Sequence, residues 1–507
     1  EGWVAACTTT FPEGPLARQH VIVGQSGGAT PEPAREALEA EIAGLVRTWS
    51  DALSGAISAS AEREHAALLL ERYGAAFGAA YRDTYTAAAA VEDIRLLERL
   101  NERRRLAVNF GRRPEDAANR VSLRLFNVAA PIPLSDRVPV LEAMGFRVVN
   151  ERTFRINPAA AAQVYLHDMT LETSSGAAID LEALDAPLEA MFMAVWNGAA
   201  ESDGYNALLV ATGTGWREIA ALRALSRYLR QARIPYSQDY MWEAMGRSPA
   251  IAAKIVALFR ARFDPDLAGD RAAAVAAIRA EIETALDGVA SLDDDTILRR
   301  FVNLVEATVR TTFYTTGPDG RPIETLAFKL DSHAIDDLPA PKPFREIWVY
   351  SPRVEGVHLR FGKVARGGLR WSDRAQDFRT EVLGLVKAQQ VKNAVIVPVG
   401  AKGGFLPKRL PPPSAGREAW LAEGTEAYKI FVSTLLSISD DLDGDRVVPP
   451  ARVVRYDGDD PYLVVAADKG TATFSDTANA IAEARGFWLG DAFASGGSAG
   501  YDHKKMG

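Results

Sequence analysis

The spacing of apolar residues divides the chain into helical regions and regions of strand-like character. Between residues 31 and 120, apolar side chains such as Leu38, Ile42 and Leu45 recur every three or four positions, which is the spacing of one helix face. Helical spacing returns between 206 and 325, where it ends in the turn-rich segment TGPDGRP. The pattern therefore predicts two separate helical regions.

Residues 121–205 show the mixed pattern of a small α+β domain. Apolar runs and alternating stretches are separated by two helical segments, so the order of elements is βαββα. A series of this length fits a two-layer sandwich of the ferredoxin type. The strands are predicted at 121–128, 146–156 and 162–172, and the helices at 135–144 and 180–197.

From residue 326 to residue 507, short strands alternate with helices, which predicts an α/β layer. The whole chain is therefore expected to be a multidomain protein of mixed α+β and α/β class. In this last region the strands are predicted at 327–330, 347–350, 357–361, 394–398 and 462–466, and the helices at 376–391, 418–438 and 474–485.

The two ends of the chain suggest a piece of a longer polypeptide. Residues 1–30 contain one short apolar run, His20–Val23, which we expect to be the last strand of a preceding domain. The opening letters EGWVAACTTT are typical of neither an initiator nor a signal peptide, and the closing letters GYDHKKMG contain no helix cap.

Composition narrows the class of protein. Of the 507 residues, 48% are hydrophobic and 24% charged, as in ordinary globular proteins. The net charge of −8 and the lack of a basic tail argue against a nucleic-acid partner. No apolar run reaches about 18 residues, so no membrane partner is expected. Cys7 is the single cysteine, which rules out an intrachain disulfide and favours a reducing, cytoplasmic location.

Cationic and amide side chains gather around glycines between residues 365 and 405. Arg366 precedes a glycine pair that begins at Gly367, and Lys402 stands in the sequence GAKGG, which we interpret as a turn. Gln389 and Lys392 share one face of a predicted helix because they are three positions apart. Cations that converge without a nearby acid fit a dicarboxylate or keto-acid site with a catalytic lysine, and they also fit a phosphate-binding surface.

Asp468 is the other candidate for chemistry. It follows a predicted strand directly and lies in a glycine-containing turn before a helix. Ligands bind at the carboxyl ends of strands in open α/β sheets, so an aspartate in this place can donate or accept a proton. Spacing alone favours the simpler interpretation, in which Asp468 is a helix cap or a loop residue.

Other motifs are interpreted as structural. The glycine strings at 24–28 and 213–215 lack the strand–GxGxxG–helix context of a dinucleotide fold, so we interpret both as turns. The acidic stretch at 441–445 resembles a calcium loop, but its glycine comes too early. The six histidines show no zinc-ligand spacing, and no metal site is predicted.

The motifs ARGGLRW, KAQQVKN and PVGAKGG, followed by AADKGTATFSD, resemble the substrate-domain core of glutamate dehydrogenases. The amino-acid sequence of these motifs is similar to that of the very large, NAD-dependent bacterial class of these enzymes. The segment PIPLSDRVPVLEAMGFRVVNERTFRI is similar to an ACT-like regulatory domain of that class. The resemblance implies that 1–30 end a preceding ACT-like domain, that 121–205 form an ACT-like domain between the two helical regions, and that 326–507 form the substrate-binding part of the catalytic domain.

The resemblance also implies roles for individual residues. Lys402 matches the catalytic lysine and Asp468 the catalytic aspartate, while Gln389 and Lys392 match groups that hold the α-carboxylate of the substrate. Arg366, followed by Gly367, stands where shorter relatives have a lysine for the side-chain carboxylate. This difference matters because a guanidinium is a planar, bidentate clamp whereas an ammonium is a point charge.

The activity implied is NAD-dependent oxidative deamination of L-glutamate to 2-oxoglutarate and ammonia. The 507 residues contain no GxGxxG fingerprint, so the main NAD domain is expected beyond residue 507 and the piece alone is expected to be inactive. An amino-acid effector at the ACT-like domain and a homo-oligomer are further expectations. The alternatives are a dehydrogenase for another amino acid and a non-catalytic regulatory or oligomerisation fragment.

Overall fold

The computed structural model describes residues 2–11, 17–28, 34–387 and 399–498. The chain divides into two compact units, which we describe separately. The first unit comprises residues 1–105 and 154–164, and the second comprises 106–153 and 165–507.

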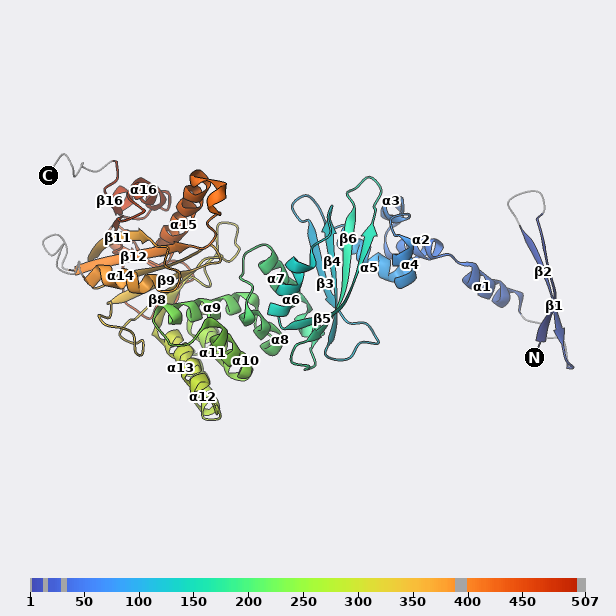
Figure 1. Ribbon diagram of the computed structural model, residues 1–507, viewed down its shortest axis with the longest axis horizontal. Coiled ribbons are helices and arrows are strands. Elements are labelled where there is room, and N and C mark those ends of the chain that lie inside the picture. The colour runs from blue at the N-terminus through green and yellow to red at the C-terminus, as the bar shows by residue number, and fades with distance from the viewer. Residues whose placement is uncertain (1, 12–16, 29–33, 388–398, 499–507) are drawn as a thin grey trace. The chain divides into compact units, whose positions relative to one another are not determined.

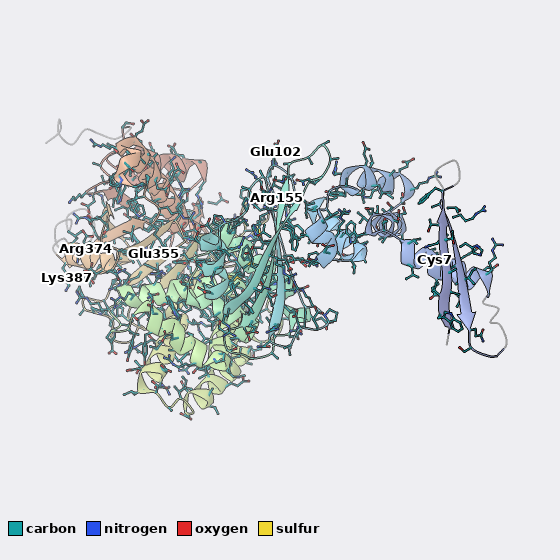
Figure 2. All side chains as sticks on the ribbon, turned by 45° about the vertical axis from the view of Figure 1, so that its right-hand side comes forward. Cys7, Glu102, Arg155, Glu355, Arg374 and Lys387 are labelled. Carbon is teal, nitrogen blue, oxygen red and sulfur yellow. The ribbon has the colours of Figure 1, made fainter. Side chains whose placement is uncertain are left out.

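The first unit contains an antiparallel hairpin and a series of short helices (Figure 1). The hairpin and the first helix bury no side chain completely, and Cys7 lies exposed on β1 (Figure 2). A hydrophobic core begins with Leu53 and Ile57 of α2, a helix that Thr48 and Asp51 cap reciprocally. The elements are β1 (Gly2–Thr10), β2 (Arg18–Gln25), α1 (Arg35–Val46), α2 (Trp49–Ser60), α3 (Arg63–Tyr73), α4 (Ala79–Thr84) and α5 (Ala87–Leu97).

A four-stranded sheet with the strand order β3-β4-β6-β5 opens the second unit, although residues 154–164, which include the end of β5 and the first residue of β6, are counted with the first unit. Its edge strand β3 lies within the region that the sequence pattern predicted to be helical. The short segment LAVNFG forms a strand because it pairs residue by residue with β4, from Leu106 opposite Asn127 to Gly111 opposite Ser122. The elements are β3 (Leu106–Gly111), β4 (Arg120–Val128), α6 (Leu134–Ala143), β5 (Phe146–Ile156), β6 (Val164–Thr173) and α7 (Leu181–Trp196).

Helices follow between residues 208 and 307. The last of them, α13, begins at the cap residue Ser291 with three aspartates in its first turn, which favours a helix start. It ends at Ala307, earlier than the periodicity predicted, because the β-branched run from Thr308 enters the next sheet as β7. The helices are α8 (Leu208–Thr212), α9 (Trp216–Gln231), α10 (Gln238–Arg247), α11 (Pro249–Phe263), α12 (Arg271–Leu286) and α13 (Leu292–Ala307).

An eight-stranded mixed sheet forms the rest of the second unit, in the order β16-β15-β11-β12-β10-β9-β8-β7. The strands β11, β12, β15 and β16 run parallel to one another, and the others pair antiparallel. They are β7 (Thr308–Thr311), β8 (Leu326–Leu330), β9 (Arg345–Tyr350), β10 (Val354–Arg360), β11 (Ala365–Trp371), β12 (Val399–Pro407), β15 (Val465–Ala467) and β16 (Ala494–Ser495), with a separate hairpin of β13 (Asp441–Asp443) and β14 (Arg446–Val448).

Helices cover both faces of this sheet (Figure 1). On one face Trp348 packs between Tyr228 of α9 and Phe378 of α14 (Phe378–Lys387). On the other face, Phe405 packs against Tyr428 and Phe431 of α15 (Arg417–Ser437), and α16 (Ser475–Ala484) lies beside α15. The mixed α/β character predicted from the sequence is confirmed. Among the described residues, no helix is both long and apolar enough to cross a bilayer.

Candidate functional site

The candidate site lies where β11, β12 and β15 run side by side. In the register of the sheet, Arg366 stands opposite Gly400 and Gly368 stands opposite Ala466. Because side chains alternate between the two faces of a strand, Arg366 and Lys402 point to the same face. That face is covered by α14, whose Val382 contacts β12 at Gly404.

Lys402 and Asp468 form an ion pair at this site. The Lys402 side chain is 3% exposed and that of Asp468 is 19% exposed. The turn that carries Asp468 is fixed because its backbone N–H donates to the Thr471 hydroxyl at 2.9 Å, and that hydroxyl donates to the Leu369 carbonyl at 2.6 Å. Asp468 is therefore held against β11. The cap position of the next helix, α16, is Phe474, so the interpretation of Asp468 as a helix cap is wrong.

Burial would raise the pKa of Asp468, but opposing contacts outweigh it. The hydrogen bond from Lys402, a backbone hydrogen bond from Lys469 and the charges of Lys402 and Arg370 hold the pKa of this carboxyl below its usual range. Asp468 is thus an anion at neutral pH. A carboxylate beside a lysine can accept a proton from a bound ammonium group.

The glycines around Lys402 belong to strands, so the interpretation of GAKGG as a turn is wrong. Lys402 lies in the middle of β12, which runs from Val399 to Pro407. A Cβ on Gly367 would meet the Ala401 carbonyl oxygen at 1.4 Å, and one on Gly403 would meet Leu369 at 2.4 Å. The glycines are required because the strands and helices approach too closely for any side chain.

Arg366 lies on the same face of the sheet and is partly buried. Its Nη2 donates to the Ser495 hydroxyl of β16 at 2.8 Å. Gln389 and Lys392 lie outside the described residues, because the description of α14 ends at Lys387 and the chain is described again from Val399.

Arg370 and Glu381 also belong to the site, although sequence reasoning assigned them no role. Arg370 Nε lies 3.6 Å from the same Asp468 oxygen that Lys402 contacts. Its Nη1 donates to Glu381 of α14 at 2.7 Å. The signal for Arg370 was present, since it is the second arginine of the ARGGLRW motif, four positions after Arg366. Nothing in the spacing of the chain pointed to Glu381.

Buried charges on other parts of the sheet fix the chain segment that leads into β15. Arg310 of β7 bonds to Asp440 at 2.6 Å, and Lys329 of β8 bonds to Asp460 at 2.7 Å. Arg360 of β10 also bonds to Asp460, at 2.9 Å. The segment before Asp468 is therefore tied to three strands.

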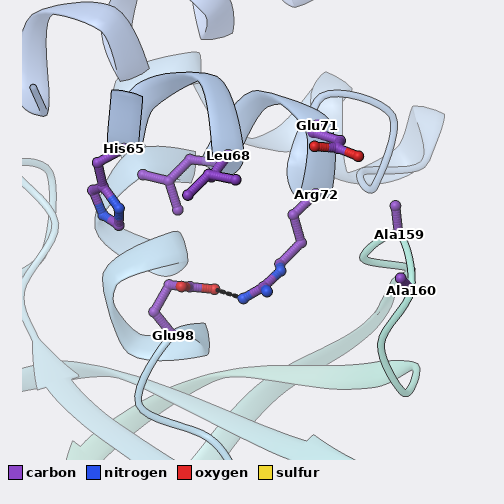
Figure 3. Close-up of a pocket in the computed structure, with 8 residues that line it drawn as sticks. His65, Leu68, Glu71, Arg72, Glu98, Ala159 and Ala160 are labelled. Carbon is purple, nitrogen blue, oxygen red and sulfur yellow. Dashed lines mark hydrogen bonds and ion pairs between the residues drawn. The ribbon is translucent and has the colours of Figure 1, made fainter. Parts of the chain in front are cut away.

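The first unit contains a pocket of about 230 Å³, shown in Figure 3. Two charged groups on its wall, Arg72 and Glu98, pair with each other at 2.8 Å. The Tyr73 hydroxyl donates to the same glutamate at 2.7 Å. Because these charges already have partners, this pocket is not our candidate for the site.

Family comparisons cover most of the chain. Residues 281–507 match the catalytic domain of bacterial NAD-glutamate dehydrogenase. Residues 105–184 match the ACT3 domain of glutamate dehydrogenase, and residues 56–100 and 200–265 match its helical motifs 2 and 3.

Curated relatives named NAD-specific glutamate dehydrogenase are similar along nearly the whole chain. The relative from Halomonas elongata is 48% identical over 499 residues, which cover 98% of this chain and 31% of the relative. The relative from Pseudomonas aeruginosa is 46% identical over 504 residues, which cover 98% of this chain and 31% of the relative. The relative from Mycobacterium tuberculosis is 45% identical over 530 aligned positions, which cover 99% of this chain and 32% of the relative. The chain spans about a third of the length of these relatives, and it belongs to the family of bacterial NAD-dependent glutamate dehydrogenases.

Proposed function

We propose that this chain supplies the substrate side of an active site that oxidatively deaminates L-glutamate with NAD. The observation that carries the proposal is the ion pair between buried Lys402 and partly buried Asp468, on a sheet face that also presents Arg366. The names of the relatives support the choice of substrate and cofactor. Lys402 and Asp468 would be the catalytic residues.

The proposed reaction converts glutamate, which enters with an α-ammonium group, together with water and NAD⁺ into 2-oxoglutarate, ammonia, NADH and two protons. The role of Asp468 would be to accept a proton from the α-ammonium group of the substrate. NAD, when bound, would supply the acceptor for the hydride of the Cα–H bond. The resulting iminium carbon is attacked by water, which Lys402 orients and polarises. The water passes one proton to the nitrogen and releases the other. The C–N bond then breaks, ammonia leaves, and the ketone remains.

Substrate binding is assigned to Arg366 on this face and, from the family motif alone, to Gln389 and Lys392, which lie outside the described residues. Arg366, with the close backbone approach that Gly367 allows, would hold the side-chain carboxylate, while Gln389 and Lys392 would hold the α-carboxylate. A dehydrogenase for an apolar amino acid needs no cation at the position of Arg366, because its substrate has no side-chain carboxylate. Arg366→Leu should therefore shift preference away from glutamate if the proposal holds, and unchanged preference would favour the alternative substrate.

NAD is assigned mainly to residues outside this chain. The nucleotide fingerprint GxGxxG, which lets backbone approach the pyrophosphate at a helix start, does not occur in the 507 residues. We propose that the chain alone binds NAD weakly and is inactive. Titration calorimetry of the isolated chain with NAD tests this, and micromolar binding would contradict it.

The remaining regions are assigned regulatory and structural roles. The order β3-β4-β6-β5 supports a ferredoxin-type, ACT-like domain, in which β3 takes the edge position beside the first strand of the βαββα series. The exposed hairpin of β1 and β2 would be the end of a preceding ACT-like domain. An amino-acid effector at the ACT-like domain, a homo-oligomer and a cytoplasmic location complete the proposal.

Substitution in the complete polypeptide tests the catalytic assignment. Lys402→Ala should lower turnover of glutamate by about 10²–10⁴-fold, because the water-orienting cation is lost. Lys429→Ala, which removes a half-exposed lysine that pairs with Glu426, is the matched control and should retain full turnover. Near-normal turnover in Lys402→Ala would exclude the assignment. Wild-type polypeptide without glutamate-dependent NAD reduction would favour the non-catalytic alternative.

A further inference from the structure

One oxygen of the Asp468 carboxylate faces two cations from neighbouring strands. Lys402 of β12 forms an ion pair with Oδ2, and Nε of Arg370 on β11 lies 3.6 Å from the same atom. Lys402 has a chemical role in the proposed reaction, but Arg370 has none. The side chain of Arg370 is only 18% exposed, so solvent screens its charge weakly at this distance.

Glu381 of α14 fixes the position of Arg370. Its Oε1 accepts a hydrogen bond from Arg370 Nη1 at 2.7 Å, and its Oε2 accepts one from the Ser372 hydroxyl at 2.7 Å. Both carboxylate oxygens are therefore occupied by donors from β11 and the residue after it. The geometry leaves the Nε edge of the guanidinium directed toward Asp468 and the Nη1 side directed toward α14.

The helix that carries Glu381 is itself anchored. Phe378 stacks on Trp348 of β9, and Arg379 bonds to the fully buried carboxylate of Glu346. Tyr228 of α9 donates to the same carboxylate at 2.9 Å. Because α14 cannot move away from the sheet without breaking these contacts, Glu381 is a rigid support for Arg370.

We propose that Arg370, supported by Glu381, is a positioning residue that fixes the Asp468 carboxylate and keeps it ionised for proton transfer. This inference rests on the proposed function of the site. Among the described residues, the charged groups facing Asp468 are Lys402 of β12 and Arg370 of β11, with Glu381 of α14 acting through Arg370.

The pH profile of kcat/KM for glutamate in the complete polypeptide tests the inference. An opposite charge within about 4–6 Å lowers a carboxyl pKa, so Arg370→Gln should move the acid limb of the profile upward by about 1 pH unit. The rate on the plateau above the limb should stay within about tenfold of wild type, since Lys402 and Asp468 remain. Arg370→Lys retains the charge and should leave the limb close to its wild-type position.

Two further variants separate the effect from simple loss of charge or stability. Arg374→Gln removes a half-exposed arginine that stands four positions after Arg370 and pairs with Asp377, and it should not move the limb (Figure 2 labels Arg374). Glu381→Asp keeps the charge but shortens the support, so it should move the limb in the same direction as Arg370→Gln and by less. Thermal unfolding of each variant shows whether the fold is retained.

Different outcomes overturn different claims. If wild type is active, Lys402→Ala is inactive and Arg370→Gln lowers kcat/KM equally at every pH, the positioning role is excluded while the proposed function stands. An unchanged profile in Glu381→Asp would exclude Glu381 as the support. Wild-type polypeptide that does not oxidise glutamate would remove both the function and the inference.

Discussion

At the scale of single residues, the site depends on what glycine permits as much as on what charged groups do. Gly367 and Gly403 let β11 and β12 approach closely, and Gly368 leaves room for the end of β15 and Asp468. This packing brings Lys402 to Asp468 although they are 66 positions apart in sequence. Lys402 and Arg370 hold the Asp468 carboxylate in place and also keep its pKa low. The position of this carboxylate and its ionised state therefore have one physical cause.

Gly367→Ala should abolish correct pairing of β11 with β12. The new Cβ would stand 1.4 Å from the Ala401 carbonyl oxygen, a backbone atom that cannot rotate away. We expect loss of soluble protein or a large fall in the unfolding temperature, measured by differential scanning calorimetry. Gly384→Ala in α14 is the matched control, since its Cβ meets nothing within 4 Å, and it should be stabilising by about 0.5–1 kcal/mol. Equal stability of the two variants would contradict this explanation.

Two residues of the candidate site could be predicted from the sequence, but the group that supports them could not. Lys402 and Asp468 follow from motifs, and the structure brings them together. Glu381 could not be predicted, because its partners Arg370 and Ser372 meet it only after α14 folds back over the sheet. Helical spacing describes a helix face and gives no information about which strand that face will cover.

At the scale of elements, buried ion pairs hold α14 and β15 in place on the sheet. Glu346 of β9 joins Tyr228 of α9 to Arg379 of α14, and Asp440 joins the segment before β15 to Arg310. We expect these contacts to determine the direction and register of the elements more than net stability, since ionic groups are costly to bury.

Glu346→Gln should destabilise the sheet–helix contact strongly. The substitution leaves the buried guanidinium of Arg379 without a counter-charge, and breaking a buried pair in this way costs about 3–5 kcal/mol. Urea unfolding followed by tryptophan fluorescence measures the change in unfolding free energy. Glu381→Gln, at a partly exposed pair, should cost less. If Glu346→Gln lowers the unfolding free energy by less than Glu381→Gln does, the ion pair of Glu346 with Arg379 is not an anchor.

The Asp440 and Asp460 contacts predict acid sensitivity. Burial would raise both pKa values, but hydrogen bonds and charges from Arg310 and Arg360 lower them below their usual range. The unfolded chain therefore takes up protons first as the pH falls, and stability is present above about pH 4 and lost below it. Asp440→Asn should unfold at lower temperature at pH 7 and show a shallower fall below about pH 4. A parallel fall in both proteins would contradict this origin.

Elements were predictable where spacing alone defined them. Strands β8 to β10 and most helices lie close to their predicted places because apolar periodicity marks them. Strands β11 and β12 were not predicted because their glycines have the composition of turns, and only pairing with neighbours makes them strands. Strands β3 and β7 were also not predicted. They are short strands at the edge of a sheet, so pairing with a neighbour defines them more than their own sequence does.

At the scale of the whole molecule, the second unit contains a buried apolar cluster that crosses the boundaries of the matched family regions. It runs from Leu106 of the four-stranded sheet through the helices to Val386 of α14. Residues 200–265 and residues 281–507 match different family descriptions, yet Tyr228 packs on Trp348 and donates to Glu346.

A chain that begins at residue 281 should therefore fail to fold cooperatively. It would lack α9 and α11 and would expose the sheet face that carries Trp348 and Phe328, which pack against Tyr228 and Phe259. We expect aggregation or binding of a hydrophobic dye, checked by size-exclusion chromatography and fluorescence. A chain beginning at residue 106 keeps the cluster and is the control. A monomeric, cooperatively unfolding chain from residue 281 would contradict the prediction.

The shared cluster also bears on how this region could change during evolution. Two residues of helical motif 3 contact the catalytic region. Tyr228 packs against Trp348, and Gln231 forms hydrogen bonds with the backbone at the start of α14. A recombination event between them would separate side chains that fit only each other. Helical motif 3 and the catalytic region should therefore be inherited as one block, and homologous exchange should succeed more readily at residue 106 than at residue 281.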